Sequence, residues 1–229
     1  MSTYPIKPIN TKSLIIAGIL GAALASQAAL LDWTAGLAED AEYRIVFLTS
    51  TTTQATSTDI GIYNAFVNAA ADLNSELDAI SWTAMGSTAT VNVRDNTGTT
   101  GAGTGIAIYT ITGNLVATDY TDLWDNTIAN EITVDEFGAN NIVTSAWTGT
   151  NGTGTTTTNN PLGAATARAG NPTREDVSGW WMNRVGAANT GSFSMYAMSG
   201  VLTVVPEPSS FALLGGLLSL GFVMVRRRR

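Results

Sequence analysis

YRIVFLT, residues Tyr43–Thr49, is the clearest strand pattern in this chain, and the rest of its organisation follows from it. β-Branched and aromatic residues dominate the stretch, as is typical of a buried strand. Residues Thr58–Ile80 then place apolar side chains three and four positions apart, which predicts one buried face of an α-helix capped by Thr58 or Ser57. The expected buried positions are Ile60, Tyr63, Phe66, Val67, Ala70, Leu73, Leu77 and Ile80.

Several short strands are expected after this helix. Apolar and polar residues alternate over Ala89–Arg94, and Ile106–Ile111 and Leu115–Ala117 flank a Thr-Gly-Asn turn that predicts a hairpin. Further strands are expected at Ile142–Trp147 and Phe193–Val205. One long helix followed by several short strands predicts a single α+β domain and argues against a parallel α/β fold.

The composition excludes several classes of protein. The 229 residues include no cysteine and no histidine, and only 13% are charged. A disulfide scaffold, a Cys/His zinc site and a histidine-dependent catalytic triad are therefore ruled out. The net charge of −7 argues against nucleic-acid binding. We expect no enzyme and no cofactor, since the general acids and bases left are Asp, Glu and Tyr.

The first 28 residues have the pattern of a secretory signal peptide. Lys7 and Lys12 form a basic region, Leu14–Ala25 is apolar, and Ser26 and Ala28 supply the small residues of a cleavage site. This pattern predicts export through the Sec translocon and removal of residues 1–28 by signal peptidase. The alternative is a buried helix at the start of the domain.

Residues 205–229 form a second targeting segment. Pro206, Glu207 and Pro208 precede an apolar stretch, Phe211–Val225. As a transmembrane helix this stretch would measure about 22 Å, short against a hydrocarbon core of about 30 Å. The chain ends in a basic stop-transfer cluster, made of Arg226, Arg227, Arg228 and Arg229.

This tail resembles the PEP-CTERM sorting signal of Gram-negative bacteria. The resemblance implies a membrane protease of the exosortase type that removes the tail near Pro206-Glu207-Pro208, so that these three residues are acted upon and do no chemistry. It also implies anchoring in the inner membrane before processing. The product would then reach the cell surface or an exopolysaccharide matrix.

The segment between the two signals, residues 29–204, is expected to fold as one extracytoplasmic domain. It holds all six tryptophans, and residues 29–205 carry five arginines, no lysine and seventeen acids, a net charge of −12. Two segments of low complexity, Gly98–Gly105 and Gly149–Asn160, are expected to be mobile surface loops.

The order of segments in residues 43–204 resembles the bacterial C-type-lectin-like domains, whose fold is similar to the endostatin module. The resemblance implies a lectin-like α+β domain, although the cysteine pairs usual in such domains are missing. No calcium-dependent sugar signature is found, so sugar binding is not inherited from the resemblance. The matching segments are Ile45–Leu48, Ser81–Ala84, Ile108–Ala117, Thr121–Ile128 with Ile132–Gly138, Ala146–Gly152 and Met195–Met198.

Two groups of residues in the domain are candidate binding sites. Asp119, Asp122 and Asp125 open an acidic stretch that continues to Glu136 and could supply oxygen ligands for calcium, but their spacing fits no EF-hand loop, which favours a solvated acidic face. Trp180 and Trp181 would face opposite sides of a strand, so that one of them could stack on a sugar ring. The alternative is that loops cover both.

The sequence therefore predicts an exported protein of the cell surface or exopolysaccharide matrix with a non-catalytic structural or adhesive role. A carbohydrate-binding module is the first alternative. A matrix-trimming hydrolase using paired carboxylates is the second.

Overall fold

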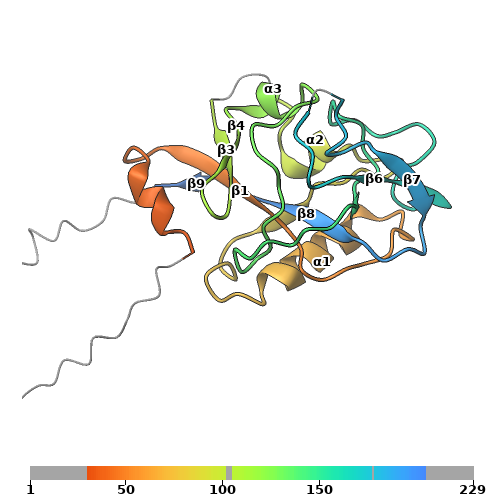
Figure 1. Ribbon diagram of the computed structural model, residues 1–229, viewed down its shortest axis with the longest axis horizontal. Coiled ribbons are helices and arrows are strands. Elements are labelled where there is room, and N and C mark those ends of the chain that lie inside the picture. The colour runs from red at the N-terminus through yellow and green to blue at the C-terminus, as the bar shows by residue number, and fades with distance from the viewer. Residues whose placement is uncertain (1–29, 102–104, 177, 205–229) are drawn as a thin grey trace, which may run out of the picture.

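A computed structural model describes residues 30–101, 105–176 and 178–204 of the chain. The described residues form one mixed sheet of nine short strands with small helices packed on it (Figure 1). The fold class is α+β, as the sequence predicts.

The elements are short, and loops connect most of them. The helical elements are η1 (Asp32–Gly36), α1 (Ile60–Ala71), α2 (Val93–Thr97) and α3 (Tyr120–Leu123). The strands are β1 (Glu42–Leu48), β2 (Trp82–Ala84), β3 (Ala107–Thr110), β4 (Leu115–Ala117), β5 (Ala146–Trp147), β6 (Thr166–Gly170), β7 (Val185–Ala188), β8 (Ser194–Ser199) and β9 (Leu202–Thr203).

The strand order is β4-β3-β1-β8-β5-β6-β7, and β2 and β9 join from the side by pairing with β8 and β1. The β1–β3 and β5–β8 pairs are parallel, whereas the other pairs are antiparallel. The predicted hairpin is confirmed as β3 and β4, and the predicted strand over Tyr43–Thr49 is confirmed as β1.

Strands β1 and β8 are buried on both faces, so side chains of alternate residues belong to two different cores. Ile45 and Phe47 of β1 face the cluster that includes α1, whereas Val46 and Leu48 face the cluster that includes α2 and α3. This explains why residues 43–49 form an uninterrupted apolar run instead of alternating with polar residues.

Helix α1 is shorter than the sequence predicts. The cap is Asp59, whose carboxylate accepts the N–H of Gly61, and not Thr58 or Ser57. The helix ends at Ala71, and the segment up to Ile80 consists of turns that leave Leu73 54% exposed. The carbonyls of the last helical turn still accept N–H groups from these turns, so the backbone stays satisfied without a longer helix.

Two predicted strands are wrong in whole or in part. Instead of a strand over Ala89–Arg94, the chain begins α2 at Val93, whose N–H donates to the hydroxyl of Ser87. The helix ends at Thr97, and Gly98 with a φ of 67° caps it. Over Ile142–Trp147 only the last two residues pair as β5. The predicted strand Phe193–Val205 is divided into β8 and β9 by Gly200 and Val201.

The segment Gly149–Asn160 is packed against the domain, which corrects the expectation of a mobile surface loop. Thr150 and Thr157 are buried, and the side-chain carbonyl of Asn151 accepts the N–H groups of Thr153 and Thr155. Such local hydrogen bonds give a polar sequence of low complexity a fixed turn structure. In Gly98–Gly105, Thr99 is also buried, and residues 102–104 lie outside the described part.

Several sequence-based predictions fall on residues that the structure does not describe. They are the signal peptide over residues 1–28, the Pro206-Glu207-Pro208 motif, the apolar stretch Phe211–Val225 and the terminal cluster Arg226–Arg229. None of the helices within residues 30–101, 105–176 and 178–204 combines the length and apolarity that crossing a bilayer requires.

Candidate functional site

The first and last described segments of the chain meet at one end of the molecule. Strand β9 pairs with the start of β1, and the N–H of Val204 donates to the carbonyl of Ala41 over 3.0 Å. The N–H of Asp40 donates in turn to the carbonyl of Val204 over 3.2 Å. At the other side of this end, the N–H of Leu30 donates to the Glu76 carboxylate over 2.6 Å. The N–H groups of Leu30 and Val204, the first and last described residues, are therefore both hydrogen-bonded to other parts of the domain.

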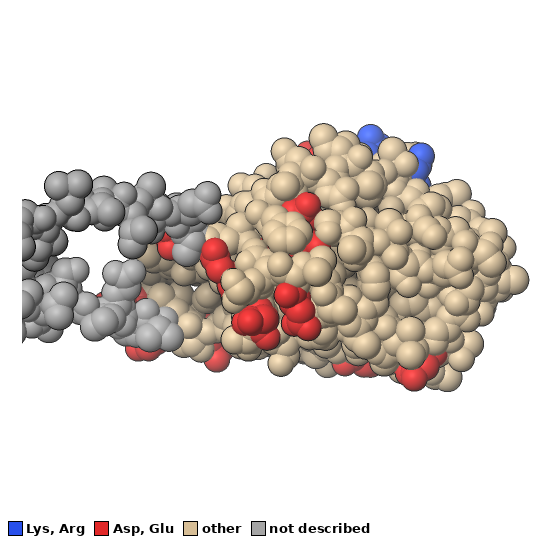
Figure 2. Space-filling model, turned by 90° about the horizontal axis from the view of Figure 1, so that it is seen from below, with Lys and Arg blue, Asp and Glu red and all other residues tan. Residues whose placement is uncertain are grey.

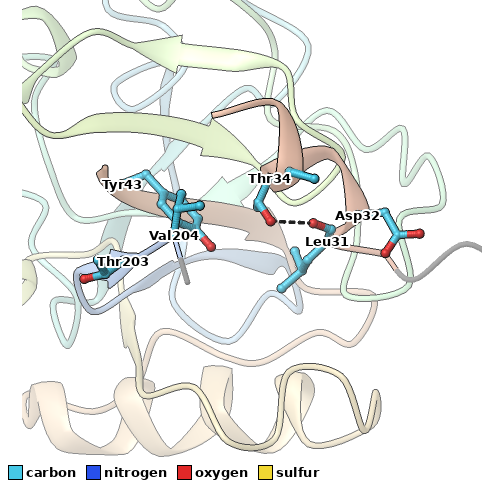
Figure 3. Close-up of a pocket in the computed structure, with 7 residues that line it drawn as sticks. Leu31, Asp32, Thr34, Tyr43, Thr203 and Val204 are labelled. Atoms are coloured by element: carbon cyan, nitrogen blue, oxygen red, sulfur yellow. Dashed lines mark hydrogen bonds between the residues drawn. The ribbon is translucent and has the colours of Figure 1, made fainter. Parts of the chain in front are cut away.

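A cleft of about 470 Å³ opens between these two segments (Figure 3). We call it the terminal cleft. Its walls come from η1 and the residue before it, from β1, and from β9 and the residue after it. The lining residues are Leu31, Asp32, Thr34, Ala35, Tyr43, Thr203 and Val204.

Hydroxyl groups supply most of the polar chemistry of the terminal cleft. The hydroxyl of Thr34 donates to the carbonyl of Leu31 over 2.9 Å, which closes the start of η1 (Figure 3). Burial raises the pKa of Tyr43, and a hydrogen bond with the Thr34 side chain offsets part of that rise. Tyr43 is therefore a neutral phenol at physiological pH, and Asp32 is the one carboxylate among the lining residues.

The two adjacent tryptophans lie in different environments. Trp181 is buried, and its ring stacks on that of Trp124 with 5.8 Å between centroids, so it cannot stack on a sugar. Trp180 is 43% exposed, as the sequence allowed for one of the pair. The two rings diverge because they lie in a turn that follows Gly179, which has a φ of 65°, and not because they alternate along a strand.

A small polar cleft of about 180 Å³ is lined in part by Arg174, which lies against the Trp180 ring. The Arg174 guanidinium lies 5.2 Å from the centroid of the Trp180 ring and forms a 2.6 Å ion pair with Asp176. The hydroxyl of Ser178, and then Arg174, lower the pKa of Asp176, so this carboxylate stays ionised. The cleft is lined by Glu131, Thr173, Arg174, Glu175 and Asp176.

The proposed calcium ligands serve as caps and turn-formers instead. Asp119 accepts two N–H groups of the first turn of α3, and Asp122 accepts the N–H and hydroxyl of Thr118. Asp125 accepts the N–H and hydroxyl of Thr127 in the same way. No three acidic residues of the described ranges come close enough together to hold a metal ion. Each of Asp119, Asp122 and Asp125 thus binds groups of its own turn.

The remaining acids of that stretch also have local structural partners or lie apart. Asp135 accepts the N–H groups of Phe137 and Ala139, and the buried Glu136 accepts the N–H and hydroxyl of Ser50. On the face that Figure 2 shows, acidic side chains occur in several separate places, most of them toward the end that carries η1 and β9. On this face the acidic side chains are thus spread over several places.

The buried cation Arg44 is structural. Its guanidinium donates to the Tyr120 hydroxyl over 2.8 Å and to the carbonyls of Thr97 and Ser199 over 2.6 and 3.1 Å. It also lies 5.2 Å from the centroid of the Tyr120 ring. One arginine therefore connects β1, α2, α3 and the end of β8.

No family model matches this chain, and no curated protein matches it either. What the protein does is therefore inferred from its own residues and their arrangement.

Sequence reasoning missed two features of these sites. The terminal cleft depends on η1, a five-residue 3₁₀ helix without a periodic apolar pattern, and on the pairing of Glu42 with Thr203 and of Tyr43 with Leu202, which lie far apart in the sequence. Arg174 was not singled out, although an arginine near two tryptophans in a chain with few cations is a signal that could have identified it.

Proposed function

We propose that this chain is an exported protein of the cell surface or exopolysaccharide matrix, sorted by an exosortase-type protease, with a structural and non-catalytic role. The main support is how close the motif lies in the sequence to a residue of the sheet. Val204 is hydrogen-bonded to the segment before β1, and one residue separates it from Pro206.

The position of both chain ends fits a domain that is tethered at one end. Seven residue steps from Val204 to Phe211 reach at most about 25 Å, so an apolar helix starting at Phe211 would keep the β9 end close to the bilayer. Strand β7 lies at the other end of the long axis (Figure 1). A tethered domain of this kind would present β7 and its neighbouring loops outward.

The proposal includes a C-type-lectin-like fold for residues 29–204. It is supported by the chain order of a central strand, a helix, a tryptophan-containing strand, a hairpin and a closing strand, which are β1, α1, β2, β3–β4 and β8. Packing around the tryptophans takes the place of the missing cysteine pairs, since Trp82, Trp124, Trp147 and Trp181 are all buried.

Sorting is tested by replacing Pro206, Glu207 and Pro208 together with alanine in the full-length chain. We expect the variant to remain in the inner membrane, because the protease would no longer recognise its substrate. The matched control replaces Ser209 and Ser210 with alanine in the same segment and should still be released. Release of the first variant at the normal level would refute sorting by this motif.

Carbohydrate binding is a second candidate function, and the exposure of Trp180 favours it. An exposed aromatic ring beside a polar cleft can stack on the apolar face of a sugar, while carboxylates and an arginine bind its hydroxyl groups. On a glycan array, binding by the full-length chain should be lost on Trp180→Ala and kept on Phe137→Ala, an exposed aromatic elsewhere. The array is run with and without calcium, and no binding in either condition would exclude this candidate.

A further inference from the structure

Leu30, the first described residue, is held in place from two directions. Its N–H donates to Oε2 of the Glu76 carboxylate over 2.6 Å. Its side chain is partly buried and packs against the core cluster that includes α1. A Cβ atom at Gly138 would lie 2.6 Å from Cδ1 of Leu30, so the glycine leaves the room that this side chain occupies. The chain therefore enters the domain at a defined place beside Glu76.

The carboxylate that binds Leu30 belongs to a turn with its own fixed structure. The N–H of Glu76 donates to the side-chain carbonyl of Asn74 over 3.0 Å. The amide of Asn74 donates in turn to the main-chain carbonyl of Glu136 over 2.8 Å. The N–H of Asn74 also donates to the carbonyl of Ala71, the last residue of α1, over 2.9 Å. The exposed side chain of Glu76 is thus presented by a segment that is tied to the domain at both sides.

The charge around Glu76 is negative. Asp72 and Asp78 are exposed on the same segment after α1, and the sequence holds no lysine or arginine between Arg44 and Arg94. Within the described ranges, no arginine forms an ion pair with Glu76. The structure therefore shows a main-chain N–H as a hydrogen-bond donor to this carboxylate, but no described cation that neutralises its charge.

Removal of the signal peptide creates a cation next to this carboxylate. Hydrolysis of the bond between Ala28 and Ala29, the cleavage predicted from the sequence, leaves a carboxylate on Ala28 and an amine on Ala29 that takes up a proton. Covalent geometry keeps this nitrogen within about 4 Å of the nitrogen of Leu30. It is therefore within about 7 Å of the Glu76 carboxylate in any backbone conformation, and rotation at residue 29 can bring the two groups into contact.

We propose that Glu76 is the binding site of the new amino terminus, whose ammonium group forms an ion pair with the carboxylate that already accepts the N–H of Leu30. The precursor cannot form this pair, because its residue 29 carries an uncharged amide nitrogen. Signal-peptide removal therefore fixes the start of the domain to the turn after α1. The inference rests on the proposed export and cleavage, and it identifies what the newly formed end binds.

The mature chain offers a selective chemical probe of this contact. Both lysines of the sequence, Lys7 and Lys12, precede the cleavage site, so the α-amino group is the one amine in residues 29–229. The protein recovered after export is treated with acetic anhydride near pH 7, and acetylation is followed by mass spectrometry. Only the neutral amine reacts, and an adjacent carboxylate favours the protonated form. We expect Glu76→Gln to be acetylated about two- to fivefold faster than the unchanged protein, as for an exposed ion pair.

Two controls separate the contact from general effects of charge and sequence. Glu39→Gln removes an exposed glutamate of the segment between η1 and β1 and should leave the rate of acetylation unchanged. In concentrated urea, the Glu76→Gln variant and the unchanged protein should react equally fast. Equal rates in the native state would overturn the inference. So would the same acceleration by Glu39→Gln, or a difference that persists in urea.

The mass of the recovered protein before acetylation tests the cleavage separately. A chain that begins at Ala29 and is acetylated at the same rate with and without Glu76→Gln would overturn the ion pair and leave the proposed export intact. A chain that begins at another residue would refute the predicted cleavage and the ion pair together.

Discussion

The main-chain N–H of Val204 donates to the carbonyl of Ala41, which ties the last described residue of the domain to the segment that leads into β1. The bond continues the β1–β9 ladder by one step. It holds the first strand and the last described residue of the chain together at one end of the molecule.

A disulfide should form across the same ladder. Glu42 and Thr203 lie opposite each other next to the bonded pair, a position where Cα atoms are close enough for a disulfide. In the cysteine-free chain we expect Glu42→Cys with Thr203→Cys to oxidise and to stabilise folding by about 2–4 kcal/mol. Unfolding in denaturant is compared with and without reductant. A pair that stays reduced under oxidising conditions would show that the ends are not adjacent.

The adjacent tryptophans should differ sharply in their effect on stability. Trp181 fills the core against Trp124 and Tyr196, so Trp181→Ala should lower the free energy of unfolding by about 3–5 kcal/mol. Trp180 is exposed, and Trp180→Ala should change it by less than about 1 kcal/mol. Urea denaturation followed by circular dichroism measures both, and similar losses for the two variants would contradict the assignment of core and surface.

Arg44→Lys should destabilise the domain although it keeps the charge. A lysine ammonium cannot reproduce the planar fork that reaches Tyr120, Thr97 and Ser199 together, so we expect a loss of about 2–3 kcal/mol. Arg184→Lys is the control, because that side chain makes a single exposed bond to Thr144. Chemical denaturation of both variants distinguishes the two sites. An equal, small effect would show that Arg44 is not a connecting residue.

The domain should lose stability at high pH. Burial raises the pKa of Tyr63, and burial together with Glu131 raises the pKa of Tyr196 well above its usual value. The folded state therefore resists losing these protons, so the stability that the two tyrosines contribute is fully present below about pH 10 and is lost as pH rises further, where the unfolded phenols ionise. The free energy of unfolding is measured between pH 8 and 11.5 to test this pH range. The Tyr196→Phe variant, which lacks one of the two phenols, is measured for comparison. A stability that increases above pH 10 would contradict it.

The sequence predicts those elements whose local pattern has one interpretation. The apolar run of β1 and the turn between β3 and β4 are of this kind, and both were expected with bounds close to those observed. The helical spacing beyond Ala71 misleads, because Leu73 and Leu77 fit a helix although Leu73 is exposed and Leu77 is buried through a turn. Val93 is ambiguous as well, since a five-residue helix and a short strand bury it equally.

Elements made of small or polar residues could not be predicted. Strands β6 (TARAG) and β7 (VGAA) have low strand propensity, and their pairing with each other and with β5 places them. The sequence pattern allowed one of the two adjacent tryptophans to be exposed, as Trp180 is. The contact of Trp180 with Arg174 and the terminal cleft depend on how the chain folds back on itself, so local patterns do not predict them. The carboxylates Asp119 and Asp122 suggested a ligand set because their roles as caps become visible only in three dimensions.

The intact mass of the protein recovered from the cell surface or the medium tests the proposed processing most directly. The account predicts a chain that begins at Ala29 and ends between Val204 and Pro208, with the segment from Phe211 to Arg229 removed. Both ends would then lie next to the hydrogen-bonded residues Leu30 and Val204. A surface form whose mass still includes the four terminal arginines would contradict the account.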